Sequence, residues 1–325
     1  MQRRPLLALA GLAPFAPAVL RAQEANWPAR PVSMIVPFVA GGPSDIVARA
    51  ASQRMAQTIG QPVVAENRPG ANGEVAARVV MRAAPDGHTL MVGSIGVWAI
   101  NAALRPNLSY DPVRDFTPLT LAVTNPNVLV VNTEKHPTTD VPGLIEWLKG
   151  RRGAASYSTS GVGSSDQLTT ELFKLRTGTE ITHVPYTGGA AAATDLIAGN
   201  VDISFQNLGT VSGHIAGGRL RALMVTGERR HPTLPNVPTA AECGLQDFVV
   251  TSWQAFMAPP NMAAPLRDRV AGALRDALMQ PEVKTRLEGI GFDVIANPPE
   301  EYSRFQQAEI ARWREVVQRA NITAG

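Results

Sequence analysis

A pair of glycines stands between an apolar segment and a helix near the start of the chain. After Val36-Pro37-Phe38 the sequence runs through Ala40-Gly41-Gly42, and a helix is predicted to begin at Pro43 or Ser44. Glycine permits backbone angles that side chains forbid, and the unpaired N–H groups of a first helical turn attract anions. The pattern therefore indicates a site in which backbone dipoles, without an arginine, hold a carboxylate.

A second passage repeats this pattern. Val184-Pro185-Tyr186-Thr187-Gly188-Gly189 again joins a strand to a helix, which contains Asp195. One Gly-Gly turn is most often an ordinary connector. Two turns with matching flanks, one in each half of the chain, predict facing halves of a cleft.

A third turn, Ser160-Gly161-Val162-Gly163-Ser164, is rich in hydroxyls and lies between a predicted strand and a helix. It can supply donors to a second carboxylate or to bridging waters. It can also cap the helix through Ser164 or Ser165. The two roles are compatible.

Two ionisable residues close to these turns have two interpretations each. Asp45 either complements the dipole of its helix, the commoner role, or selects an amino or hydroxyl group of a ligand. His183 precedes the second Gly-Gly turn, but a single histidine beside a strand is more often structural.

Catalytic and cofactor motifs are missing from the sequence. It has no phosphate-binding loop, Gly161-Val162-Gly163 lacks the third glycine of a dinucleotide fingerprint, and the five histidines show no metal-ligand spacing. We therefore expect no enzyme activity, no metal and no cofactor. The alternative from another class is an exported hydrolase with Ser160 or Ser164 as nucleophile, which requires a histidine within hydrogen-bond reach.

The first 22 residues have the order of a secretory signal. Arg3 and Arg4 precede an apolar run from Pro5 to Leu20, with Ala22 at a plausible cleavage point, and the paired arginines also fit twin-arginine export. Removal of residues 1–22 takes three arginines and no acid from a chain of net charge +3, which leaves 0. A neutral protein lacks the basic face that nucleic-acid binding needs. Export to the periplasm is expected, and the single Cys243 is expected to be a small buried side chain.

Strands and helices alternate along both halves, which predicts an α/β fold with a mostly parallel sheet and two lobes. Two long apolar stretches, Leu119 to Val131 and Val249 to Met257, are placed to cross between the lobes. The late amphipathic helices, Pro265 to Met279 and Pro299 to Arg319, are predicted to pack on the sheet of the first lobe.

The three turns, together with Gly199-Asn200-Val201-Asp202 and Pro85-Asp86-Gly87, resemble the Bug family of periplasmic solute receptors of tripartite tricarboxylate transporters. The resemblance runs from about Trp27 to the C-terminus. It implies a type II periplasmic-binding-protein clamshell with crossing hinge strands: lobe 1 at 27–121 and 253–325, lobe 2 at 122–252.

The resemblance also implies a function. The protein would capture a small carboxylate between its lobes and deliver it to membrane permease subunits, with a monomer as the expected state. The implied ligand-binding residues come from both lobes: Phe38, Ala40, Gly41, Gly42, Asp45, Ser94, Ser160, Gly161, Ser164, Tyr186, Gly188, Gly189 and Asn207. Many relatives have a histidine where this chain has Gln167, so that contact is not carried over. A sensory receptor with the same fold is the alternative.

Overall fold

The computed structural model describes residues 27–319 and residue 322. The predicted export signal, residues 1–22, lies outside these residues. Within the described part of the chain, no helix is both long and apolar enough to cross a membrane.

The first lobe is built on three parallel strands with helices on both faces. Successive side chains of its central strand point to opposite faces, so Met34 enters one apolar core and Ile35 the other. The elements are β1 (Val32–Val36), α2 (Pro43–Ile59), β2 (Val63–Asn67), η1 (Ala71–Gly73), α3 (Glu74–Met81), β3 (Thr89–Ser94), η2 (Gly96–Ile100) and α4 (Asn101–Leu104).

The second lobe repeats the alternation of strands and helices. Its core gathers Phe173, Phe205 and Phe248 in mutual ring contact, and Cys243 packs partly buried against that core. The elements are α5 (Val141–Arg151), β5 (Ser156–Thr159), α6 (Ser165–Thr177), β6 (Thr182–Pro185), α7 (Gly189–Ala198), β7 (Ile203–Asn207), α8 (Leu208–Ala216) and β8 (Leu220–Val225).

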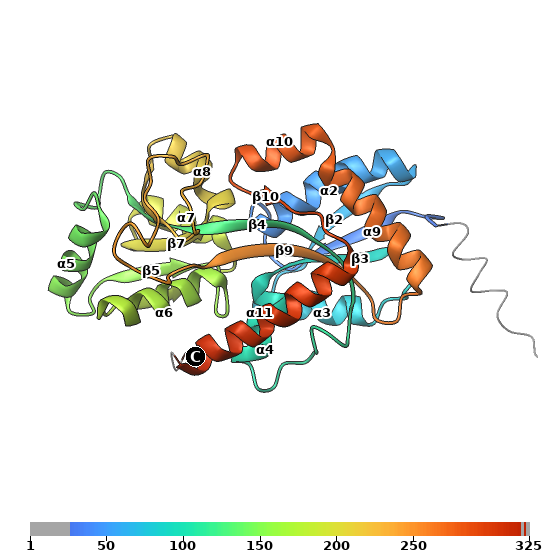
Figure 1. Ribbon diagram of the computed structural model, residues 1–325, viewed down its shortest axis with the longest axis horizontal. Helices are drawn as coiled ribbons and strands as arrows, with labels where there is room; N and C mark the ends of the chain where they lie inside the picture. Colours follow the sequence, from blue (N-terminus) through green and yellow to red (C-terminus); the bar gives the residue numbers. More distant parts are fainter. Residues whose placement is uncertain (1–26, 320–321, 323–325) are drawn as a thin grey trace, which may run out of the picture.

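Two strands join the lobes, β4 (Thr117–Asn132) and β9 (Thr251–Ala258). They run side by side across the middle of the molecule (Figure 1). β4 pairs with β9 as far as Pro126, and from Asn127 onward it pairs with β7 and β8 in the second lobe. The sheet order is β2-β1-β3-β9-β4-β7-β5-β6, so one sheet runs through both lobes.

The expectation of a mostly parallel sheet is correct within each lobe and wrong for the whole. β1 with β2 and β3, and β5 with β6 and β7, are parallel, whereas every pairing of β4 and β9 is antiparallel. The reason is the path of the chain. β4 carries it from the first lobe to the second and β9 carries it back, so the two strands must run in opposite directions.

The C-terminal elements return to the first lobe, as predicted. Leu274 of one helix lies in the same core as Met34, and Trp313 of another lies in the same core as Ile35, so the two helices cover opposite faces of the sheet. The elements are α9 (Ala264–Met279), α10 (Pro281–Gly289), β10 (Asp293–Val294) and α11 (Pro299–Arg319).

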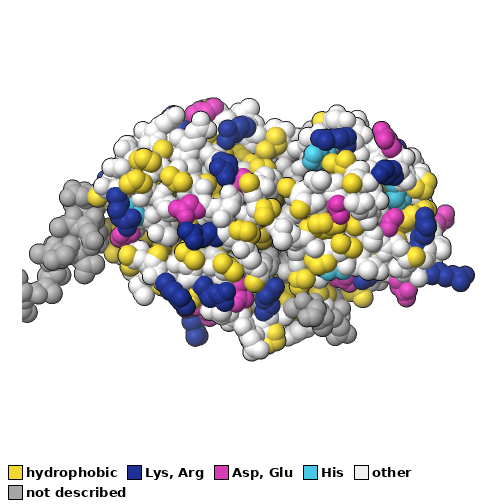
Figure 2. Space-filling model, turned by 180° about the vertical axis from the view of Figure 1, so that it is seen from behind, with side chains coloured by type: hydrophobic (Ala, Val, Ile, Leu, Met, Phe, Trp, Pro, Cys, Tyr) yellow, Lys and Arg dark blue, Asp and Glu magenta, His cyan; other side chains and the backbone are white. Residues whose placement is uncertain are grey.

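The molecule is a two-lobed clamshell. Seen from behind, it consists of two rounded halves with a furrow between them, and basic and acidic side chains are interspersed on that face (Figure 2). The exact lobe boundaries, 121/122 and 252/253, stay predictions.

Candidate functional site

The N-termini of four helices meet in a small cavity between the lobes, which we call the inner cavity. α2 comes from the first lobe, and α6, α7 and α8 come from the second. The cavity has a volume of about 30 Å³. It is lined by Phe38, Gly42, Pro43, Ser44, Ser94, Ser160, Ser164, Ser165, Asp166, Gly188, Gly189, Asn207, Ser252 and Gln254.

The lining of the inner cavity contains no lysine, arginine or histidine, and Asp166 is its one ionisable residue. The groups that the lining can offer an anion are the backbone N–H groups and dipoles of the helix N-termini, together with serine and amide donors. This arrangement suits an anion such as a carboxylate.

The first Gly-Gly turn is braced by Asp45. Gly42 is the N-cap of α2 and Pro43 its first residue, while Gly41 has the left-handed φ of 84°. The Asp45 carboxylate accepts hydrogen bonds from the Gly41 N–H (3.0 Å) and from Asn67 Nδ2 (2.9 Å), and it pairs with Arg49 at 2.9 Å. The carboxylate is thus fully engaged within the first lobe.

The pKa of Asp45 reflects this engagement. Burial acts to raise the pKa, but the hydrogen bonds from Arg49, Gly41 and Asn67 outweigh it and hold the pKa below its ordinary value. Asp45 therefore stays ionised at neutral pH in the first turn of α2, which fits the interpretation as a complement to the helix dipole.

The second Gly-Gly turn uses its two glycines for different reasons. Gly188 has φ 151°, and a Cβ there would lie 2.9 Å from Cγ2 of Val39 in the other lobe. A Cβ on Gly189 would lie 2.9 Å from Oε1 of Gln206. The first glycine supplies both the conformation and the space, and the second supplies space for close packing against β7.

The serine-rich turn caps a helix, which is one of the two roles predicted for it. Ser164 is the N-cap of α6, and its Oγ accepts from the Gln167 N–H at 3.3 Å. Gln167 Oε1 accepts in return from the Gly163 N–H at 2.6 Å. This reciprocal arrangement resembles a capping box. Gln167 is therefore a structural part of the turn in this chain.

Asp166 lies completely buried at the base of the same turn. Its Oδ2 accepts from the N–H and the Oγ of Ser160, at 2.5 and 2.8 Å, and from Gln206 Nε2 at 3.3 Å. Burial raises the pKa of Asp166 above its ordinary value, and the hydrogen bonds from Ser164 and Ser160 offset this only in part. A carboxyl group with a raised pKa thus borders the inner cavity.

The two candidate nucleophiles, Ser160 and Ser164, are hydrogen-bonded to groups other than histidine. Ser160 Oγ donates to Asp166, and Ser164 Oγ donates to the Gly161 carbonyl at 2.6 Å. In residues 27–319 neither serine is hydrogen-bonded to a histidine. The nearby His183 bonds to Thr159 Oγ1 at 2.7 Å and stacks on Tyr157, which is the structural role expected of it.

Amide side chains form the hinge side of the inner cavity. Asn207 donates to Ser165 Oγ at 3.2 Å and accepts from Ser252 Oγ at 3.3 Å. Ser44 Oγ of α2 donates to Gln254 Oε1 of β9 at 2.6 Å. The Gln254 Nε2 is buried without a hydrogen-bond partner, which leaves a donor at a residue that lines the cavity.

A larger cavity, the outer cavity, lies next to the inner one. The two share Phe38 and Ser160, and the outer cavity has a volume of about 280 Å³. Its walls again come from both lobes: Pro37, Phe38, Pro69, Gly70, Ala71, Asn72, Arg105, Ser160, Gly161, Val162, Pro185, Tyr186 and Thr187.

The sequence-predicted residues divide among these cavities. Eight of them line the inner cavity: Phe38, Gly42, Ser94, Ser160, Ser164, Gly188, Gly189 and Asn207. Gly161 and Tyr186 line the outer cavity, whereas Ala40, Gly41 and Asp45 line neither. The sequence reasoning missed Pro43, Ser44, Ser165, Asp166, Ser252 and Gln254 in the inner cavity and Arg105 in the outer one.

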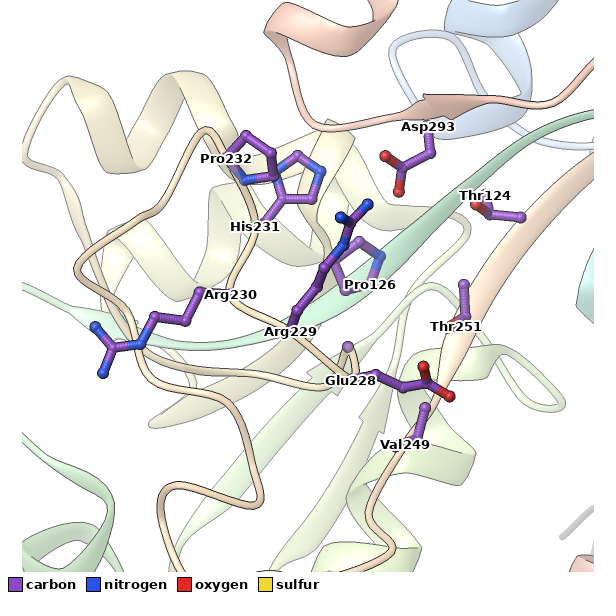
Figure 3. A pocket seen from close by; sticks show the side chains of 11 residues that line it. Thr124, Pro126, Glu228, Arg229, Arg230, His231, Pro232, Val249, Thr251 and Asp293 are labelled. Carbon is purple, nitrogen blue, oxygen red and sulfur yellow. The ribbon is translucent and has the colours of Figure 1, made fainter.

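A third cavity, of about 440 Å³, lies behind the hinge strands (Figure 3). Thr251 lines it, while the next residue, Ser252, lines the inner cavity. Neighbouring residues of a strand point to opposite faces, so this hinge cavity and the inner cavity lie on opposite sides of β9. Its walls include Asp293 of β10 and Arg229 from the loop after β8.

The described residues hold no group of three or more histidine, cysteine, aspartate or glutamate side chains that could bind a metal ion. The two cavities between the lobes are lined by neutral donors and helix N-termini, with the Asp166 carboxyl group at the inner cavity and Arg105 at the outer one.

Comparison with known proteins gives a consistent result. Residues 47–322 match the tripartite tricarboxylate transporter family receptor. The chain is 35% identical to Protein BugT of Bordetella pertussis, over 90% of each chain. A solved R. palustris protein with adipate is 35% identical over 92% of this chain and 99% of that one, with a TM-score of 0.87. MatC from Rhodopseudomonas palustris with bound malate is 35% identical over 90% of this chain and 100% of that one, with a TM-score of 0.86. The chain belongs to the tripartite tricarboxylate transporter receptor family, whose members are periplasmic solute-binding proteins.

Proposed function

We propose that the protein captures a small carboxylate between its lobes in the periplasm and delivers it to the permease subunits of a tripartite tricarboxylate transporter. The observation that carries this proposal is the convergence of four helix N-termini on a cavity without a cationic side chain. Backbone N–H groups at a helix start bind carboxylates without help from arginine or lysine.

Both lobes contribute to the site, which supports a clamshell mechanism. α2 of the first lobe faces α6 and α7 of the second, and Gly188 lies close to Val39 across the cleft. A ligand that touches both lobes binds the closed form more tightly than the open form. It therefore shifts the equilibrium toward closure, and a permease that recognises the closed form would accept only loaded receptor.

The solved relatives support the class of ligand. One is described with adipate and the other with bound malate, and both ligands are small carboxylates. We propose the same class for this chain, with donors from the N–H groups of Gly188 and Gly189 and from the unpartnered Gln254 Nε2. Ser160 and Ser164 line the cavity, but their own N–H and O–H groups donate to Asp166 and to the Gly161 carbonyl.

Calorimetry of the protein purified from the periplasmic fraction tests the ligand class. The panel should hold mono- and dicarboxylates together with neutral amides of the same size. We expect binding of at least one acid and none of its neutral amide. Tight binding of a neutral compound, with no acid bound, would contradict the proposal. The mass of the purified protein shows in the same experiment whether residues 1–22 have been removed.

Uptake measurements test the delivery step. Cells that produce the permease should accumulate a labelled acid only when the receptor is also present. Unchanged uptake in cells without the receptor would favour the sensory alternative, in which the closed receptor signals to a partner and transports nothing.

A further inference from the structure

The inner cavity is too small for a complete organic acid. A cavity needs about 10–15 Å³ to hold one water molecule, so a volume of about 30 Å³ accepts roughly two waters or one carboxylate group. If a carboxylate occupies it, the rest of the ligand must extend beyond it. The outer cavity, which shares Phe38 and Ser160 with the inner one, is the adjoining space.

The outer cavity has one cation among its lining residues, Arg105. Arg105 directly follows α4, where the backbone leaves the helix with φ −113° and ψ 99°. The Arg105 side chain is 24% exposed. It is thus mostly enclosed by its neighbours in the cavity wall.

The guanidinium of Arg105 has few partners of its own. Its Nε is buried and has no hydrogen-bond partner. Its nearest carboxylate is Glu74, whose Oε2 lies 3.9 Å from Nη1, while the other oxygen of Glu74 is held by Arg78 at 3.2 Å. A guanidinium has five N–H donors in a planar fork that matches a carboxylate. The buried Nε cannot reach a ligand, but neither Nη group has a hydrogen bond in the described residues, so the two Nη groups retain donors for one.

We propose, as an extension of the function proposed above, that Arg105 binds the second carboxylate of an extended dicarboxylate. The first carboxylate lies at the helix N-termini of the inner cavity, the carbon chain passes between Phe38 and Ser160, and the second carboxylate meets Arg105. The receptor then prefers linear diacids over acids that carry a neutral group at the far end.

Calorimetry with matched ligands tests the role of Arg105. A series of linear dicarboxylates from succinate to suberate is compared with the corresponding monoamides, which keep the length and lose the second charge. For the best diacid, we expect the wild-type protein to bind it at least tenfold more tightly than its monoamide. In Arg105→Gln this preference should fall to less than threefold, with the affinity for the monoamide unchanged.

Two further variants define the effect. Arg78→Gln removes a cation that also pairs with Glu74 but lines neither cavity, and it should keep the wild-type preference. Arg105→Lys keeps the charge and loses the planar fork, so it should retain only part of the preference.

The outcomes separate this inference from the proposed function. Equal affinity of the wild-type protein for a diacid and its monoamide, or an undiminished preference in Arg105→Gln, would overturn the role of Arg105 and leave carboxylate capture standing. If no acid binds at all, the proposed function itself fails. If Arg105→Gln does not fold, a crystal structure of the wild-type protein with a diacid decides: a far carboxylate without contact to Arg105 would overturn the inference.

Discussion

Gly188 and Val39 belong to different lobes, and a Cβ placed on Gly188 would lie 2.9 Å from Cγ2 of Val39. The contact joins the two segments that carry the Gly-Gly turns. Real Cβ atoms do not approach other carbons this closely, because packed atoms lie about 3.5–4 Å apart. The absence of a side chain at Gly188 is therefore a condition for the cleft to close to the extent seen here.

Replacement of Gly188 by alanine should weaken ligand binding by tenfold or more. The methyl group strains a backbone with φ 151° and holds Val39 away, so the closed form becomes less favourable. Calorimetry with the best acid of the panel measures the loss. Gly178→Ala is the control, because Gly178 also has a positive φ, 64°, but has open space around it. An equal loss of affinity in both variants would contradict this explanation.

Asp45→Asn should destabilise the first lobe by about 2 kcal/mol at neutral pH, the usual range for hydrogen bonds to a charged group. The substitution removes the charge that Arg49 and the Gly41 N–H bind. Thermal unfolding measures the difference. Arg49→Gln, which leaves the bonds from Gly41 and Asn67 in place, should lose less.

The lowered pKa of Asp45 determines how the destabilisation caused by Asp45→Asn changes with pH. Because the pKa in the folded state is below the ordinary value of 3.8, the stabilisation is complete above about pH 4 and is lost as the pH falls through the folded-state pKa. The difference between wild type and Asp45→Asn should therefore shrink in strong acid. A difference that stays constant down to pH 2 would show that the charge is not its source.

The sequence predicted the turns well because glycine and serine motifs act locally. Gly188 needs a positive φ, and Ser164 caps the helix that it precedes. Ser252 and Gln254 were missed because they line the inner cavity only if their face of the hinge strand is turned toward the cleft. The signal was present in Val249–Met257, where Ser252 and Gln254 are spaced two residues apart, the spacing of one strand face, within a largely apolar stretch.

Local sequence patterns could not predict the role of Arg105 or the presence of the short helices. Arg105 reaches the cleft only because α4 ends beside the outer cavity. The spacing of residues in the sequence does not predict where that helix ends in space. α8 has nine residues, too few for a clear helical period. The antiparallel hinge was missed because strand direction follows from the path of the whole chain.

Ligand affinity should rise as the pH falls from neutral through the pKa of Asp166. The pKa of Asp166 is raised above its ordinary value, so its folded form takes up a proton before an ordinary aspartate does, and a negative charge disappears beside the anion site. A monocarboxylate ligand, with an ordinary carboxyl pKa of about 4, stays ionised over most of this range and is the suitable probe. Calorimetry across the range measures the trend.

Asp166→Asn should abolish this dependence on pH, because the amide stays neutral. The same raised pKa means that protonation also increases the free energy of unfolding as the pH falls toward 3.8, and the variant should lose that trend as well. Asp202→Asn is the matched control: Asp202 accepts from the N–H and Oγ of Ser156 in the second lobe, but it does not line the inner cavity. Persistence of the pH dependence in Asp166→Asn would assign it to another group.

A bulky side chain behind the hinge should increase ligand affinity by about threefold to tenfold. Thr251 lines the hinge cavity (Figure 3), and the neighbouring Ser252 lines the inner cavity on the opposite face of β9. When the cleft between the lobes opens, the walls of the hinge cavity on the other side of β9 move toward each other. A tryptophan in place of Thr251 fills that cavity and opposes this movement. The open form is then disfavoured, and less binding energy is spent on closure.

Calorimetry of Thr251→Trp measures the gain in affinity, and small-angle scattering of the unliganded protein measures the closure. We expect a smaller radius of gyration than in the wild type without ligand and nearly the same radius with ligand. Thr58→Trp places the same ring at an exposed position on α2 and should change neither value. A weaker affinity in Thr251→Trp, together with an unchanged radius, would mean that the hinge cavity does not contract when the cleft opens.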